Sequence, residues 1–276
     1  MVGETARNSR LNRDIIQGCL SEYALEYPLQ LEVLESVVST NDHVLAFARG
    51  GGRASFACIA EQQTGGRGRN GAVWESPVNA NIYLSLGYYF NQFAASELSG
   101  LSLACGVSLA RMLKSMGLEA QLKWPNDVLL EYRKLAGILI ETRVRSEGVY
   151  VVIGLGMNVD MPESAGRKID QPWVDLRRVL PTAFVQRNQL AAQLLDALLS
   201  CCAEYDRSGF ASFLDDWHSF DVLSGHQVIV KTQAGERQAK VKGIDKGYGL
   251  RVEIEGVEEV FYAADVKLEL SNHADD

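Results

Sequence analysis

The sequence lacks the cysteine and histidine patterns that bind zinc or build disulfide frameworks. Its 276 residues include five cysteines and four histidines. No two cysteines have Cys-x-x-Cys spacing. Cys201 and Cys202 lie in an apolar run with helical periodicity, where buried thiols are more common than metal ligands. These absences argue against a zinc site and a disulfide scaffold, so we expect a reduced, cytoplasmic protein.

A basic excess and a long apolar run are also missing. The 27 Lys and Arg residues stand against 35 Asp and Glu residues, which gives a formal net charge of −8. General nucleic-acid binding requires a basic face, so this balance argues against it. No stretch has the apolar length to span a bilayer, and the chain does not open on a signal peptide. We expect neither DNA nor a membrane among its partners.

The short motifs of several enzyme classes are absent as well. No serine or cysteine stands in a Gly-x-Ser-x-Gly context, which argues against a hydrolase elbow. The stretch TGGRGRNGAVW (64–74) has no Gly-Lys-Ser/Thr end. A strand pattern follows it, where a Walker or Rossmann loop requires a helix. Those two nucleotide-binding folds are therefore not predicted.

The sequence does contain alternating strand and helix patterns, followed by a C-terminal part without helix patterns. Strand patterns cover 30–38, 53–63 and 79–90, and helix patterns cover 43–51, 96–117 and 187–209. Beyond residue 223 only short strand runs remain, spaced by glycine and charged turns, as is typical of a small antiparallel barrel. We predict an α+β fold with a connector or tail over 1–29, a main domain with a mixed sheet over 30–222, and a small β domain over 223–276.

The loop 64–74 combines flexible backbone with fixed positive charge. Glycine costs conformational entropy unless the backbone needs φ > 0 or must approach something closely. Arg67 and Arg69 offer permanent charge and a planar donor fork suited to phosphate or carboxylate. The pattern indicates a loop that closes over an anion, with an ordinary solvated hairpin loop as the alternative.

Three further stretches are open to two interpretations each. KWPND (123–127) is either a turn or a site in which Lys123 and Asp127 hold Mg²⁺ or a nucleotide. Lys134 begins an apolar strand, where an isolated lysine is usually solvated. GLGMN (154–158) is either a bulged strand end or a place where a ligand ring approaches the backbone.

Together and in this order, these stretches resemble the biotin protein ligase family. The matching segments are STN (39–41), QTGGRGRNGAVW (63–74), KWPND (123–127), RKLAGIL (133–139) and GLGMNV (154–159). The likeness continues through GLSLACGVSLARML (100–113) and GIDKGYGLRVE (243–253). It implies a class II synthetase-like catalytic domain followed by an SH3-like barrel.

The resemblance also implies a reaction in two steps. The biotin carboxylate attacks the α-phosphate of ATP to give biotinoyl-5′-AMP and pyrophosphate. A lysine of the biotin carboxyl carrier protein of acetyl-CoA carboxylase then takes the biotinoyl group. ATP and Mg²⁺ are the implied cofactors, and a homodimer is one of the oligomeric states found in the family. Fixed cations suit this chemistry because two anions must be brought together.

Site residues carry over only at matched positions. Those matching biotin contacts are Ser39, Thr40, Asn41, Gln63, Arg67, Gly68, Arg69 and Lys134. Those matching the ATP side are Trp74, Lys123, Asn126, Asp127 and Asn158. Lys134, Arg69 and Arg67 are the implied catalytic residues, and Asp127 is the candidate Mg²⁺ ligand.

The sequence departs from the family pattern at two places. Ala72 stands where the loop usually has a third arginine, so we expect altered kinetics and not inactivity. Only about thirty residues precede the matched region, too few for the DNA-binding module of some members, so we expect a ligase without a repressor half. The alternatives are a lipoate-type ligase, told apart by which acid forms an adenylate, and a non-catalytic biotin sensor that binds DNA.

Overall fold

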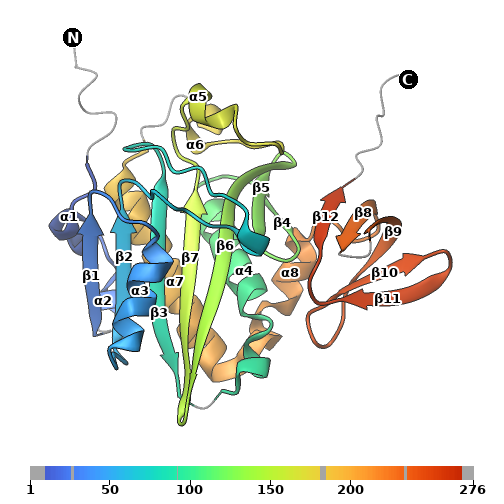
Figure 1. Cartoon of the computed structure of the whole chain (residues 1–276), viewed down its shortest axis with the longest axis horizontal. Coiled ribbons are helices and arrows are strands. Elements are labelled where there is room, and N and C mark those ends of the chain that lie inside the picture. The colour runs from blue at the N-terminus through green and yellow to red at the C-terminus, as the bar shows by residue number, and fades with distance from the viewer. Residues whose placement is uncertain (1–9, 26–27, 92, 181–184, 233–234, 269–276) are drawn as a thin grey trace.

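The computed structural model describes residues 10–25, 28–91, 93–180, 185–232 and 235–268. Two β-sheets organise the chain, a large one in the N-terminal part and a small one at the C-terminal end (Figure 1). Within the described residues, no helix combines the length and the apolar composition that crossing a membrane requires.

The large sheet has seven strands in the order β1-β2-β3-β7-β6-β5-β4. Its strands are β1 (Leu29–Leu34), β2 (Ser55–Ala60), β3 (Ile82–Phe90), β4 (Ala120–Lys123), β5 (Asp127–Leu130), β6 (Arg133–Arg145) and β7 (Gly148–Met157). Only β1 and β2 are parallel, and every other neighbouring pair is antiparallel. The predicted mixed sheet is confirmed.

Helices cover both faces of this sheet. They are α1 (Arg13–Gly18), α2 (Glu22–Leu25), α3 (Thr40–Arg49), α4 (Leu101–Ser115), α5 (Glu163–Gly166), α6 (Leu176–Val179), α7 (Arg187–Ser208) and α8 (Leu214–Phe220). Short 3₁₀ turns are η2 (Arg69–Gly71), η3 (Ala95–Leu98) and η4 (Gly209–Phe213). The long helices α4 and α7 pack together behind the sheet, and α3 lies on its front face (Figure 1). Strands β2 and β3 are accordingly buried along nearly their whole length.

Helix α3 begins at Thr40, three residues before the helix pattern predicted over 43–51. Ser39 is its N-cap residue, with extended backbone and a hydroxyl that accepts from the amide of Asp42. Helix α4 ends before Gly117, whose φ of +80° is the left-handed conformation that terminates helices. The N-terminal connector is attached to this body, because Leu11 is buried and its amide donates to Glu61. Residues 1–9 of the predicted tail lie outside the described residues.

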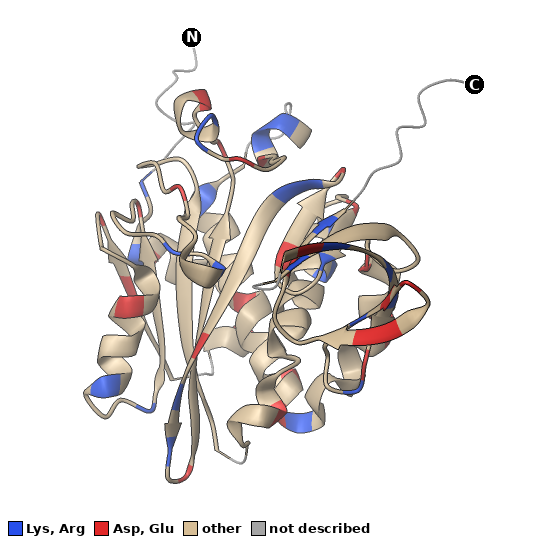
Figure 2. Cartoon of the chain, turned by 45° about the vertical axis from the view of Figure 1, so that its right-hand side comes forward, with Lys and Arg blue, Asp and Glu red and all other residues tan. Residues whose placement is uncertain are grey.

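The small sheet confirms the predicted C-terminal barrel, and no helix occurs among the residues that the structure describes beyond 223. Its strands are β8 (Gln227–Thr232), β9 (Gly235–Ile244), β10 (Leu250–Ile254), β11 (Val257–Phe261) and β12 (Asp265–Leu268). They follow the order β11-β10-β9-β8-β12, are antiparallel throughout and curl around one another (Figure 2). The indole nitrogen of Trp124 donates to the carbonyl of Tyr248 over 3.0 Å. This bond and the Phe210–Tyr248 ring contact at 4.7 Å attach the barrel beside the β4–β5 edge of the large sheet.

Candidate active site

A cavity of about 870 Å³ lies between the glycine-rich loop, the large sheet and the barrel. Its volume falls in the range of sites for small organic ligands. Every site residue expected from the sequence lines it except Asn158: Ser39, Thr40, Asn41, Gln63, Arg67, Gly68, Arg69, Trp74, Lys123, Asn126, Asp127 and Lys134. These residues are far apart in the sequence, so the fold brings them together.

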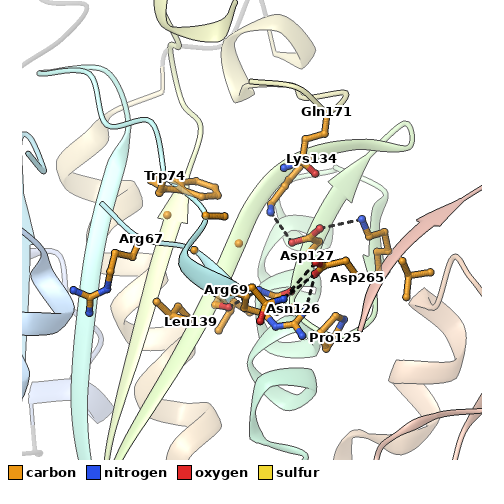
Figure 3. A pocket seen from close by; sticks show the side chains of 18 of the residues that line it. Arg67, Arg69, Trp74, Pro125, Asn126, Asp127, Lys134, Leu139, Gln171 and Asp265 are labelled. Carbon is orange, nitrogen blue, oxygen red and sulfur yellow. Dashed lines mark hydrogen bonds and ion pairs between the residues drawn. The ribbon is translucent and has the colours of Figure 1, made fainter. Parts of the chain in front are cut away.

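Lys134, Asp127 and Lys123 form a charge cluster in this cavity. Figure 3 shows the Lys134–Asp127 pair. The Nζ atom of Lys134 lies 2.7 Å from Oδ1 of Asp127, and Nζ of Lys123 lies 3.2 Å from Oδ2. Burial raises the pKa of the Asp127 carboxyl, but the two ammonium groups outweigh burial and hold that pKa below its ordinary value. The formal charges leave an excess of one positive charge facing the cavity.

Neighbouring strands hold the cluster in place. Lys123 and Asp127 face each other across the β4–β5 hairpin that the Trp-Pro-Asn turn closes. Lys134 stands near the start of β6. Its amide donates to the Pro172 carbonyl, and its carbonyl accepts from the Val174 amide. Strands β4, β5 and β6 thus hold the backbones of Lys123, Asp127 and Lys134, whose side chains meet at the carboxylate of Asp127.

Trp74 lies across strands that carry glycine. A Cβ atom at Gly156 would stand 2.3 Å from the Trp74 indole, and one at Gly137 would stand 3.0 Å from it. The Lys134 ammonium lies 5.4 Å from the centre of the Trp74 rings. The two glycines therefore leave the space that the Trp74 indole occupies, so the ring beside this backbone is a protein side chain, and the approach of a ligand ring stays a prediction.

A chain of polar contacts forms the opposite end of the cavity. Gln63 Oε1 accepts from the Thr40 amide over 2.9 Å and from its hydroxyl over 3.1 Å. The hydroxyl of Ser85 lies 2.7 Å from Thr40 Oγ1 and 2.6 Å from Asn41 Oδ1. Since Ser85 is fully buried, this network is fixed by the sheet beneath it.

Arg67 and Arg69 point in opposite directions from the loop (Figure 3). Both terminal nitrogens of Arg69 lie 3.4 Å from the Ala264 carbonyl of the barrel, and Asp265 is 3.8 Å away. Arg67 pairs with Asp42 and Glu141 on the other side. The sequence predicted two cations aimed at one anion, whereas in the structure each arginine already has protein partners.

Comparison with known proteins identifies the family. The family model "Biotin/lipoate A/B protein ligase family" matches residues 33–158. The "Bifunctional ligase/repressor BirA" of Escherichia coli is 34% identical over 238 residues, which cover 86% of this chain and 73% of that protein. The "Biotin--[acetyl-CoA-carboxylase] ligase" of Mycobacterium tuberculosis is 33% identical, with coverage of 86% and 88%. The chain belongs to the biotin protein ligase family.

Solved structures of biotin protein ligases share its fold. One from Aquifex aeolicus, in complex with biotin and ATP, has a TM-score of 0.71 at 24% identity and covers 88% of this chain and 99% of that chain. One from Leishmania major, in complex with biotinyl-5-AMP, has a TM-score of 0.58 at 23% identity. The likeness to both includes the large mixed sheet, so the family's fold is confirmed.

In this biotin protein ligase, Asn158 does not lie in the cavity, where the sequence predicted that it would contact ATP. It is buried, and its amide nitrogen donates to the carbonyls of Lys134 and Val174, 3.3 and 3.1 Å away. It is not among the cavity-lining residues. In this structure Asn158 supports the backbone of Lys134, and its contact with adenine stays a prediction.

The residues present do not form a resident magnesium site. Both oxygens of Asp127 are occupied by lysines, and the amide nitrogen of Asn126 donates to the Ile138 carbonyl over 2.7 Å. Among the described residues, no group of three or more His, Cys, Asp or Glu side chains converges. Because Mg²⁺ in nucleotide sites is held largely by phosphate oxygens and water, the metal fits as part of the ATP complex and not as an ion held by Asp127.

Sequence reasoning missed several residues around the cavity. The sequence offered a signal for Ser85, since it is the one small polar residue in the buried strand β3, whose other residues are aliphatic, aromatic or glycine. Asp42 and Glu141 gave none, because carboxylates on a helix and a strand are ordinarily solvated. Lys231 and Lys267 of the barrel also line the cavity, and only the tertiary fold brings them there.

Proposed function

We propose that this chain activates biotin with ATP and transfers the biotinoyl group to a lysine of a biotin carboxyl carrier protein. The observation that carries the proposal is the Lys134–Asp127–Lys123 cluster at the centre of a ligand-sized cavity. It leaves a net positive site between the polar end at Thr40 and the barrel. The carrier of acetyl-CoA carboxylase is the expected partner, from the printed name of the Mycobacterium tuberculosis relative.

The polar end near Thr40 suits the ring of biotin. Gln63 and Asn41 offer amide groups, and Ser39 and Thr40 offer hydroxyl groups, beside strands that are otherwise apolar. A fused ring with a urea group requires a few placed polar contacts within an apolar lining. Held there, the valerate chain of biotin would extend along β6 toward Lys134.

The first step forms a bond between two anions. A carboxylate oxygen of biotin attacks the α-phosphorus of ATP, and the bond to the bridging oxygen breaks so that pyrophosphate leaves. In this proposal Lys134 would contact both the carboxylate and the α-phosphate, and Lys123 would face the leaving pyrophosphate. Fixed cations in a site with little water lower the energy of such a transition state because they need no reorganisation.

Trp74 and the loop suit retention of the mixed anhydride. The indole lies over Gly156 and Gly137, where it offers an apolar face to the nucleotide. The loop reaches the barrel, where Arg69 contacts the Ala264 carbonyl. Excluding water from biotinoyl-5′-AMP prevents its hydrolysis before the carrier arrives.

The second step is acyl transfer. The deprotonated ε-amine of the carrier lysine attacks the carbonyl carbon of the anhydride, the carbon–oxygen bond to AMP breaks, and the amide nitrogen loses its extra proton to solvent. The same lysine cluster stabilises the departing phosphate of AMP. MgATP supplies the metal, which neutralises the phosphate oxygens.

The testing experiment is biotin-dependent exchange of labelled pyrophosphate into ATP, with lipoate in place of biotin as the control. Exchange with biotin alone supports the first step. Exchange with lipoate alone would favour the lipoate-type alternative. Tight biotin binding without exchange, together with sequence-specific duplex binding, would favour the sensor.

A further inference from the structure

The guanidinium of Arg67 is held between two carboxylates. Its Nη1 atom lies 2.5 Å from Oδ2 of Asp42, and its Nη2 atom lies 2.9 Å from Oδ1. The same Nη2 atom lies 3.2 Å from Oε2 of Glu141. Two parallel bonds to one carboxylate are the geometry in which arginine pairs most strongly and with defined orientation.

The two carboxylates that hold Arg67 come from different elements of the fold. Asp42 belongs to the first turn of α3. Glu141 lies on β6, opposite Val152 of β7, and its Oε2 atom also accepts from Nδ2 of Asn41 over 2.8 Å. The contacts of Arg67 therefore connect the glycine-rich loop to both a helix and the sheet.

This arrangement does not suit a residue that neutralises substrate charge. The two carboxylates outnumber the guanidinium, and Arg49 also acts on Asp42, so the positive charge of Arg67 is already compensated within the protein and is not left for a substrate carboxylate or phosphate. The hydrogen bond from Arg67 lowers the pKa of Asp42, so this partner is ionised at neutral pH. In Figure 3 Arg67 also points away from the Lys134–Asp127 pair.

We propose that Asp42, Arg67 and Glu141 form a clasp that positions the loop, so that Arg67 acts as a positioning residue and not as a ligand of biotin or ATP. The proposal rests on the proposed function for its effect on catalysis. The clasp fixes the start of the loop over the biotin end, and the contact of Arg69 with Ala264 fixes its far side. Only Gly68 separates these two anchors in the sequence.

The clasp and a substrate-binding role predict opposite effects when the carboxylates are removed. If Arg67 binds substrate anions, the variant D42N/E141Q frees it from its competitors, and biotinoyl-5′-AMP is retained longer. If Arg67 positions the loop, the same variant loosens the loop, and biotinoyl-5′-AMP is released faster. Because these contacts are about one-third exposed, we expect the release rate to rise only about three- to tenfold.

The experiment has two readouts on the full chain. The first is hydrogen exchange of the peptide covering 64–73 without ligand, which we expect to quicken in D42N and D42N/E141Q. The second is the release rate of added biotinoyl-5′-AMP, measured beside kcat at saturating biotin and ATP. We expect kcat to stay within about twofold of the wild-type value, since the clasp does not touch the reacting atoms.

Glu32→Gln is the matched control. The Glu32 carboxylate on β1 lies 2.7 Å from the ring of His43, which belongs to α3, the helix that also carries Asp42. This carboxylate does not contact Arg67, so both readouts should remain at the wild-type values. Unchanged exchange and release in D42N/E141Q, or slower release, would overturn the clasp. If the chain does not bind the adenylate at all, the proposed function fails, while the exchange readout still decides the clasp.

Discussion

Lys134 and Asp127 share an ion pair of 2.7 Å between neighbouring strands, at a point where the pairing of β5 and β6 is irregular. The register shifts between Val128 and Leu129, so the strands do not continue as a regular ladder beside the pair. A bulge redirects side chains locally. Here it accompanies the meeting of two lysines, from β4 and from β6, at one carboxylate of β5.

Replacing Asp127 with asparagine should reduce biotin-dependent pyrophosphate exchange by roughly 10²- to 10³-fold. The change removes the negative charge that holds Lys134 and Lys123 in place, and the two ammonium groups then repel each other. Lys134→Ala should abolish exchange by removing the cation itself. Initial rates of exchange, measured at saturating ATP, test both variants.

Asp216→Asn is the control for this prediction. Asp216 accepts a 2.5 Å bond from Arg111, at a site outside the cavity. Loss of this ion pair should leave exchange at the wild-type rate. If both variants lose exchange equally, the loss reflects general destabilisation and the assignment of Asp127 is wrong.

The same carboxylate should make stability depend on pH in the acid range. The native pKa of Asp127 lies below the unfolded value, so the native state binds fewer protons there. Its stabilising effect is fully present above the unfolded pKa of about 3.9 and is lost as the pH falls through the native pKa. Urea unfolding between pH 6 and pH 3 should show a smaller decline for Asp127→Asn than for the wild type. An identical decline in the two proteins would contradict the ion pair.

Local features of this fold were predictable because they depend on neighbouring residues. The buried strand β2 lies within the strand pattern of 53–63, and helices α4 and α7 lie within the helix patterns of 96–117 and 187–209. The barrel was predictable as a class, since short strand runs without helical periodicity leave few alternatives.

Contacts between distant residues were not predictable in the same way. Arg67 pairs with Glu141, 74 positions away, and Arg69 contacts Ala264, 195 positions away. Periodicity records which face of an element is buried, but not which element lies opposite. For Lys134 the residue pattern alone favoured a solvated side chain, and only the family resemblance indicated a site. The structure gives the physical reason, a buried carboxylate at 2.7 Å.

Gly156→Ala should displace Trp74 and weaken ligand binding. The new Cβ atom would stand 2.3 Å from the indole, so the ring must move. We expect the KM values for biotin and ATP to rise about tenfold, since small displacements of a positioning group have large effects. Tryptophan fluorescence and initial rates test this. Gly18→Ala, with no atom within 4 Å of its new Cβ, is the control and should change neither readout.

Ala72→Arg should restore the third cation of the family's loop. Ala72 lines the cavity, and we expect an arginine there to contact the phosphates of ATP bound as proposed. We expect the KM for ATP to fall about threefold, the size of an exposed charge contact, with the KM for biotin unchanged. Ala72→Gln adds length without charge and should leave both constants unaltered. An equal gain with glutamine would show that side-chain size, and not charge, limits the loop.

Thiol labelling tests the packing that supports the site. Of the five cysteines, only Cys19 is exposed, while Cys58, Cys105, Cys201 and Cys202 are buried. Burial raises the pKa of Cys58 to about 12, with a smaller contribution from Glu32, so at pH 8 it is a protonated and inaccessible thiol. A disulfide reagent should therefore label one thiol per native chain and five after unfolding. Cys19→Ser should reduce native labelling to zero. Rapid labelling of any thiol in that variant would mean that the native state opens, either beside α3 at Cys58 or in the α4–α7 layer, where Cys105 and Cys201 lie 3.9 Å apart.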